Sequence, residues 1–254
     1  MTGSHKPTLD KFNSGFTLVE IAMVLFIVAL LLGGLVPTIN VQLEQQRTNE
    51  TRKKISEIKD ALIGFAIING RLPCSADGTR SPGQAGYGTE RTPPCTAGTA
   101  YGVVPWITLG TSETDGWGNR FTYRVAYDFA DTTDGSTGAC GATTAGVSFQ
   151  LCSTIPANPN LLTVQSAAAG TVIASKIPVI IISHGKNGYG AYSPLGGSPP
   201  LSVPVGNTDE VANTDHISNT VYVSHSQTSG FDDLVDWVPI TILDNRMVAA
   251  GKLP

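Results

Sequence analysis

The chain has 254 residues, with 16 basic and 20 acidic side chains and a formal net charge of −4 at neutral pH. This length allows one globular domain with a substantial hydrophobic core. The mildly acidic balance, with no cluster of Lys and Arg on the part expected to be soluble, argues against nucleic-acid binding through phosphate contacts.

The first predicted element is an apolar run over residues 16–36, in which Glu20 is the only charged residue. As a helix these 21 residues rise about 30 Å, the thickness of the hydrocarbon core of a bilayer. We therefore expect a transmembrane helix over residues 16–38. A carboxylate in such a span costs up to about 2.5–3.5 kcal/mol at the bilayer centre, so Glu20 is expected to find a partner. No A-x-A cleavage site follows the run, unlike in a secretory signal peptide.

Beyond Pro37 the pattern stays helical, and we expect an amphipathic helix over residues 39–70. Apolar side chains recur there with a 3.6-residue period, at Ile55, Ile58, Leu62 and Phe65. Asn69-Gly70 is predicted to end the helix in a left-handed turn, with Pro73 beyond it as a stop. The stripe is shorter than three heptads, which disfavours a coiled coil. Its apolar face therefore has to be covered by the domain that follows the helix.

Residues 71–254 are predicted to form a β-rich globular domain. Strands are expected over residues 120–127, 147–151, 177–183, 221–224 and 234–240, and a short closing helix over 242–250. Turn-rich segments over residues 75–100, 131–146 and 184–214 read as loops. The fold class is therefore α+β, in which a long N-terminal helix, half membrane anchor and half amphipathic, packs on an antiparallel sheet with disulfide-stapled loops.

The four cysteines are an even set without a CxxC pair: Cys74, Cys95, Cys140 and Cys152. In an oxidising compartment they should form two disulfides, and three pairings are possible. Cys74–Cys95 and Cys140–Cys152 are favoured, because each closes a short, turn-rich loop worth about 2–4 kcal/mol.

The run Gly15-Phe16-Thr17-Leu18-Val19-Glu20 resembles the prepilin signature of the type IV pilin superfamily, which includes the pseudopilins of type II secretion. The resemblance implies cleavage between Gly15 and Phe16 by prepilin peptidase, N-methylation of Phe16, and an assembly role for Glu20. Pro37 stands at the 22nd position from Phe16, where the family often has a proline. Residues 1–15 are then the leader. An ordinary signal-anchor is the alternative interpretation.

A second resemblance concerns the type II secretion pseudopilins. Asp115-Gly116-Trp117-Gly118-Asn119-Arg120-Phe121-Thr122-Tyr123 is similar to their D-x-W-G-N-x-Y-x-Y segment, and Ser183–Gly188 to a turn that has Asp where this chain has Asn187. Those proteins bind calcium before the last strand. The resemblance implies a calcium site from Asp209, Glu210 and Asp215, with Asn213 nearby. Ordinary solvated loop acids are the competing interpretation, and no other cofactor is expected.

Catalytic patterns are absent from the sequence. Gly185, Gly188 and Gly190 follow an apolar segment, but the G-x-G-x-x-G spacing of dinucleotide-binding loops breaks at Ser193. His184, His216 and His225 lack a supporting G-x-S-x-G or H-E-x-x-H motif. We therefore expect no enzyme activity and no catalytic residue.

The predicted function is a non-enzymatic filament subunit, either a minor pilin or a type II secretion pseudopilin. The expected partners are prepilin peptidase, other pilin or pseudopilin subunits, the inner-membrane assembly platform and membrane lipid. Lys6 and Lys11 favour a cytoplasmic N-terminus, whereas Arg47 and Arg52–Lys54 favour the opposite. The resemblance favours a single pass with a periplasmic or extracellular domain at 71–254. A tip adhesin, or a monomeric membrane-anchored periplasmic protein, remains an alternative.

Overall fold

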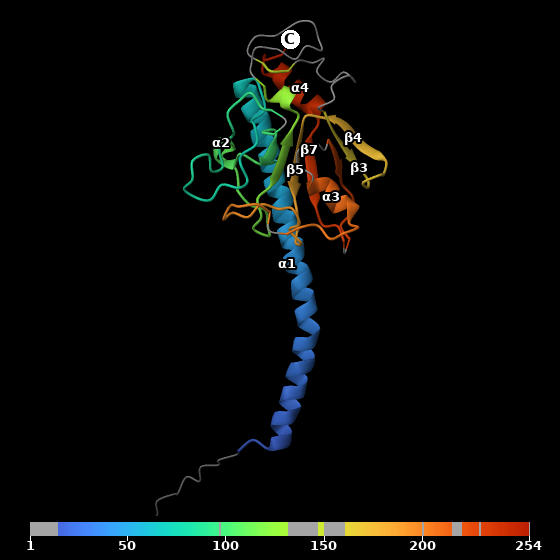
Figure 1. Ribbon diagram of the computed structural model, residues 1–254. Coiled ribbons are helices and arrows are strands. Elements are labelled where there is room, and N and C mark those ends of the chain that lie inside the picture. The colour runs from blue at the N-terminus through green and yellow to red at the C-terminus, as the bar shows by residue number, and fades with distance from the viewer. Residues whose placement is uncertain are drawn as a thin grey trace, which may run out of the picture. The chain divides into compact units, whose positions relative to one another are not determined.

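The computed structural model describes residues 15–96, 98–131, 147–149, 161–199, 201–214, 220–228 and 230–253, without the side chains of residues 32–39. The chain divides into two compact units, Met1–Gln45 and Gln46–Pro254, and each is described by itself. The elements in chain order are α1 (Leu18–Asn69), β1 (Tyr101–Val103), α2 (Trp106–Leu109), β2 (Thr122–Val125), the 3-10 turn η1 (Tyr127–Phe129), β3 (Leu162–Gln165), β4 (Val172–Ile177), β5 (Val179–Ser183), α3 (Thr208–Thr214), β6 (Val221–Val223), β7 (Leu234–Val238) and α4 (Ile240–Ala249) (Figure 1).

The first unit consists of the early part of α1 and the residues before it. Its large apolar side chains are exposed: Phe16 before the helix, and Leu18, Val19, Ile21, Met23, Val24, Leu25, Phe26, Ile27, Val28, Leu30 and Leu31 on it. Among the described residues, no helix is at once long enough and apolar enough to span a membrane.

In the second unit, α1 packs into the core through the predicted stripe. Ile55, Ile58 and Leu62 are fully buried, while Phe65 is half-buried and leaves Ala66 to complete the buried face. The helix ends at Asn69, and Gly70 has φ 69° with its N–H bonded to the Ala66 carbonyl at 2.8 Å. This confirms the predicted left-handed helix end.

The main sheet has the strand order β1-β2-β5-β7, and every neighbouring pair is antiparallel. Its central strand β5 is buried on both faces, so alternate side chains enter different cores. Val179 and Ile181 join the cluster that contains the α1 stripe, whereas Ile180 and Ile182 join the cluster under a second sheet.

The second sheet has the order β4-β3-β6, with β3 antiparallel to β4 and parallel to β6. Leu162 and Val164 of β3, with Tyr222 of β6, cover the face of the main sheet opposite α1. The second unit is therefore layered as α1, main sheet and small sheet, and Figure 1 shows the β3–β4 hairpin beside β5 and β7. The α+β expectation is confirmed, together with the packing of α1 on an antiparallel sheet.

Several predicted elements differ from the structure. Residues 147–149 were expected to begin a strand but form none, because Phe149 packs on Phe129 with ring centroids 4.8 Å apart and Ser148 binds the Gly70 and Phe129 carbonyls; residues 150–151 lie outside the described ones. The expected strand at 120–127 is shorter and is followed by η1. Helix α3 interrupts the predicted loop at 184–214, and β1, β3 and β4 were not predicted.

Candidate functional site

The residues of the predicted cleavage site precede the helix. Gly15, Phe16 and Thr17 are non-helical and exposed, and Phe16 retains 80% of its accessible surface. A Cβ placed on Gly15 would meet no atom within 4 Å. The Gly15–Phe16 peptide bond therefore lies in an open, non-helical segment that a peptidase can reach.

Glu20 lies in the first turn of α1 and interacts with Thr17. The Glu20 N–H donates to Thr17 Oγ1 at 3.3 Å, and Oε2 of Glu20 accepts from both the Thr17 N–H and the Thr17 hydroxyl at 3.4 Å. This reciprocal arrangement is a capping box, since each side chain satisfies a backbone N–H that the helix leaves free.

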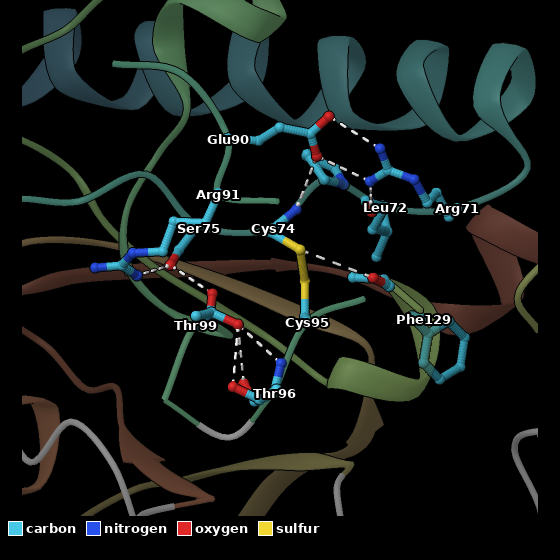
Figure 2. Close-up of a disulfide and its surroundings, with 12 residues drawn as sticks. Arg71, Leu72, Cys74, Ser75, Glu90, Arg91, Cys95, Thr96, Thr99 and Phe129 are labelled. Carbon is cyan, nitrogen blue, oxygen red and sulfur yellow. Dashed lines mark hydrogen bonds and ion pairs between the residues drawn. A yellow bond between two sulfur atoms is a disulfide. The ribbon is translucent and has the colours of Figure 1, made fainter. Parts of the chain in front are cut away.

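One disulfide joins Cys74 and Cys95, whose Cα atoms lie 5.7 Å apart (Figure 2). It confirms the first of the two favoured pairings; Cys140 and Cys152 lie outside the described residues. Next to it, Arg71 makes two bonds to the Glu90 carboxylate, at 2.8 and 2.9 Å, and Glu90 also accepts the Cys74 N–H at 3.2 Å. The base of the 75–94 loop is therefore held by a covalent bond and a part-buried ion pair.

The same loop is tied to the loop that follows β5 by Arg120, whose side chain is fully buried. Nε donates to Glu113 Oε1 at 3.0 Å, and Nη2 lies 2.9 Å from the same oxygen in an ion pair. The remaining donors reach three carbonyls at 2.8–2.9 Å, those of Gly78, Arg80 and Pro194. The rings of Tyr87 and Trp106 lie about 5 Å from the guanidinium. The buried charge therefore has four hydrogen-bond acceptors and a carboxylate counter-charge.

The Asp115–Asn119 turn, which carries the second sequence resemblance, links α1 to the sheet. Asp115 accepts the N–H groups of Trp117 and Asn119 at 2.9 Å and the Ser183 hydroxyl at 2.6 Å. Burial raises the pKa of the Asp115 carboxyl, and these hydrogen bonds oppose the rise. The Gly116 N–H donates to Thr51 Oγ1 at 2.9 Å, and a Cβ at Gly116 would clash with the Arg47 backbone. Glycine is therefore needed where the turn meets the helix.

An acidic cluster is formed by α3 and the two residues directly before β7. Ligand oxygens of Glu210, Asp232 and Asp233 lie within 4.8 Å of one another. Glu210 is fully buried, Asp233 is 3% exposed, and each of the three residues has one buried carboxylate oxygen without a hydrogen-bond partner. Burial and the charge of Asp233 raise the pKa of Glu210 to about 7, and burial also raises the pKa of Asp232. Several buried carboxylates facing one another call for a cation or for protons.

The surroundings of the cluster suit an oxygen-binding cation. The Asn187 side chain and backbone donate to Glu210 and Asp232, which orients the two carboxylates. A groove of about 320 Å³ reaches Asp233 and is lined also by Arg52, His225 and Asp236. Of the three acids, only Asp233 lines this groove.

Of the three acids predicted from sequence, only Glu210 belongs to this cluster. Asp209 binds the Ala168 N–H at 2.7 Å and His225 at 3.2 Å, and Asp215 lies outside the described residues. Asn213 lies beside the cluster: its amide bonds to both the N–H and the carbonyl of Val223 and also donates to Asp233 Oδ2 at 2.7 Å. Asp232 and Asp233 were missed; their place directly before the last strand was the available signal.

His184 completes a buried relay with Thr122 and Asp233. Its Nε2 lies 2.9 Å from Thr122 Oγ1, and its Nδ1 lies 3.4 Å from Asp233 Oδ1. Burial opposes the charged imidazolium, but the carboxylates of Asp233, Glu210 and Asp115 outweigh it and raise the pKa of His184. The hydroxyl, imidazole and carboxylate match the order of a catalytic triad. All three are buried, so no substrate reaches the hydroxyl, and the relay is structural.

Comparison with known proteins gives one match. Residues 10–36 fit the model of the prokaryotic N-terminal methylation motif, with Gly15, Phe16 and Glu20 inside the matched range. The chain carries a prepilin signal. This is the signal of type IV pilins and pseudopilins, structural subunits that are generally non-enzymatic. No curated protein and no solved structure matches the chain.

Proposed function

We propose that this prepilin-like chain is a subunit of a type IV pilus-like filament, either a minor pilin or a type II secretion pseudopilin. The observation that carries the proposal is the prepilin signal at residues 10–36, with the Gly15–Phe16 bond exposed ahead of α1. Prepilin peptidase cuts this bond and Phe16 is methylated.

The cleaved subunit is stored in the inner membrane through residues 16–38, with the domain at 71–254 outside. Support comes from the ring of exposed apolar side chains between Phe16 and Leu31. On assembly, a neighbouring subunit's N-terminal amine pairs with Glu20. In a low-dielectric filament interior this pair compensates the burial of both charges only if its geometry is good. Assembly is thus a transfer of the apolar helix from lipid to a bundle of subunits.

Intact-mass measurement on membrane-extracted protein tests the processing step. The expected mass is that of residues 16–254 plus one methyl group; retention of residues 1–15 in a strain with active prepilin peptidase would contradict the proposal.

Substitution of the assembly carboxylate tests polymerisation. Glu20→Gln should leave the membrane pool unchanged, because a neutral side chain inserts more easily, yet deplete the sheared filament fraction. Removal of one member of a buried charge pair typically costs about 3–5 kcal/mol. Glu57→Gln, at an exposed position of α1, is the matched control. Equal filament fractions for wild type and Glu20→Gln would show that Glu20 takes no part in assembly.

A tip or binding subunit of such a filament is a second candidate, favoured by one observation. Arg120 donates hydrogen bonds to carbonyls of both the 75–100 loop and the 184–214 loop and so ties the two loops together. Two loops held rigidly together are typical of a recognition surface on a fixed scaffold. Loss of surface adhesion with intact filaments, when exposed residues of these loops are changed, would support this role.

We also propose that Glu210, Asp232 and Asp233 bind calcium. Support comes from the closeness of their carboxylate oxygens and from one buried oxygen on each that lacks a hydrogen-bond partner, although Asp233 Oδ1 also faces His184 Nδ1 at 3.4 Å. Calcium should raise the unfolding temperature of the detergent-solubilised chain, since a ligand at 100 times its Kd adds about 2.7 kcal/mol. Glu210→Gln and Asp233→Asn should abolish the increment, whereas Asp209→Asn, a neighbour outside the cluster, should retain it. A wild-type chain with equal unfolding temperatures in calcium and in chelator would contradict the site.

A further inference from the structure

Each carboxylate of the acidic cluster has one oxygen in a hydrogen bond and a second, buried oxygen without one. Glu210 Oε1 accepts from the Asn187 amide at 2.9 Å and from the Asp232 N–H at 3.3 Å, whereas Oε2 has no hydrogen-bond partner among the described residues. Asp232 Oδ2 accepts the Asn187 N–H at 2.8 Å, and Oδ1 receives no hydrogen bond from that part of the chain. Asp233 follows the same pattern, with the Asn213 amide 2.7 Å from Oδ2.

His184, which is not one of the three acids, adds a further unsatisfied atom beside the cluster. Its side chain is fully buried, and within the described residues its Nδ1 has no hydrogen bond. This nitrogen lies 3.4 Å from Asp233 Oδ1, one of the oxygens without a hydrogen bond. Buried polar atoms without partners are costly, so their convergence from separate elements points to a bound species.

Asn187 connects two acids that come from different elements. Glu210 lies on α3 and Asp232 lies before β7, while Asn187 lies in the loop after β5 and donates to both. The side-chain oxygen of Asn187 accepts the Tyr189 N–H at 2.9 Å. Because that oxygen is used inside the loop, the NH2 group is the part of the amide that faces Glu210. The turn itself therefore directs a donor at this carboxylate.

We propose that Asn187 is the positioning residue of the calcium site. It holds Glu210 Oε1 and Asp232 Oδ2 and leaves the second oxygen of each for the cation. The proposal rests on the calcium binding proposed above for this cluster. An amide suits the position because it donates without adding charge, whereas a carboxylate there would place two acceptors against each other.

Two variants of Asn187 separate the lost donor from an added charge. Asn187→Asp keeps the size of the side chain and an acceptor for the Tyr189 N–H, but replaces the donor with an acceptor. Asn187→Ser stays neutral and is too short to reach Glu210. Thr208→Asp, at the exposed first residue of α3, adds a charge near the cluster without touching Asn187 and is the control.

The measurement is a calorimetric titration of calcium into the full-length, detergent-solubilised chain after removal of metal with a chelator. Both Asn187 variants should raise the calcium Kd about tenfold or more, the usual effect of losing an outer hydrogen bond to a metal ligand. Thr208→Asp should not raise it. Counting charges alone predicts the opposite for Asn187→Asp, because an added carboxylate tightens calcium binding.

The positioning role is overturned if Asn187→Asp binds calcium as tightly as wild type or more tightly, or if Asn187→Ser binds as wild type does. The unfolding temperature in chelator shows that each variant is folded, and if one is not, the other decides. A wild-type chain that gives no heat of calcium binding is a different result, since it contradicts the calcium site itself and the positioning role with it.

Discussion

The buried and half-buried carboxylates in this molecule have different hydrogen-bond partners, and these differences affect their pKa values. Asp115 has two backbone donors and a hydroxyl, whereas Asp244 on α4 has a buried Oδ1 without a hydrogen-bond partner. Burial alone raises the pKa of Asp244 to about 6. Its ionisation therefore opposes folding, because the charged form is better solvated in the unfolded chain.

Asp244→Asn tests this at the residue scale. Between about pH 4 and pH 6 the native state binds more protons at this position than the unfolded state, so its contribution to stability falls as the pH rises. The substituted side chain does not ionise, so the variant does not lose stability at this position as the pH rises. Urea unfolding should show it to be more stable than wild type at pH 7, on the order of 1 kcal/mol after allowance for partial exposure, with little difference near pH 4.

Asp60→Asn, at an exposed position on α1, is the control for that measurement and should follow the wild-type pH profile. A constant difference between Asp244→Asn and wild type from pH 4 to pH 7 would show that the variant acts through packing instead of ionisation.

At the scale of elements, the 75–94 loop is held at its base by two different interactions. The disulfide closes it covalently, and the Arg71–Glu90 pair fixes the strand-like entry at Cys74 (Figure 2). Because the pair does not depend on oxidation, a reduced loop keeps part of its anchoring.

Replacing Cys74 and Cys95 together by alanine should therefore destabilise the chain by about 2–4 kcal/mol without abolishing folding. Limited proteolysis should then cut first within 75–94, where many residues are exposed and backbone hydrogen bonds are few. Adding Glu90→Gln should increase the cutting further. Unchanged proteolysis in the alanine variant would mean that the disulfide adds nothing to the order of the loop.

At the scale of the whole molecule, local periodicity predicted the elements that face a large core. The α1 stripe, its end at Gly70 and the strands β2, β5, β6 and β7 all lay within predicted segments. Strand β1 has only three residues and includes Gly102, and β4 has exposed Val172 and Ile173, so neither shows the alternation of a half-buried strand.

The candidate sites also differ in how far the sequence predicts them. Gly15, Phe16 and Glu20 are neighbours in sequence and could be read directly, and the Cys74–Cys95 pair followed from the short loop it closes. The acidic cluster could not be read in full, because Glu210 is joined to Asp232 and Asp233 only by tertiary contacts of α3 with the residues before β7. Spacing along the chain carries no record of such contacts.

The buried Arg120 has a consequence for how this chain can diversify. Its guanidinium requires three carbonyl groups, from Gly78, Arg80 and Pro194, to converge from two loops far apart in sequence. An insertion that moves one loop leaves donors of a buried cation unsatisfied, even though the other loop is unchanged. Related subunits should therefore exchange or lengthen the two loops together, and a graft of one loop alone should fail where a graft of the pair succeeds.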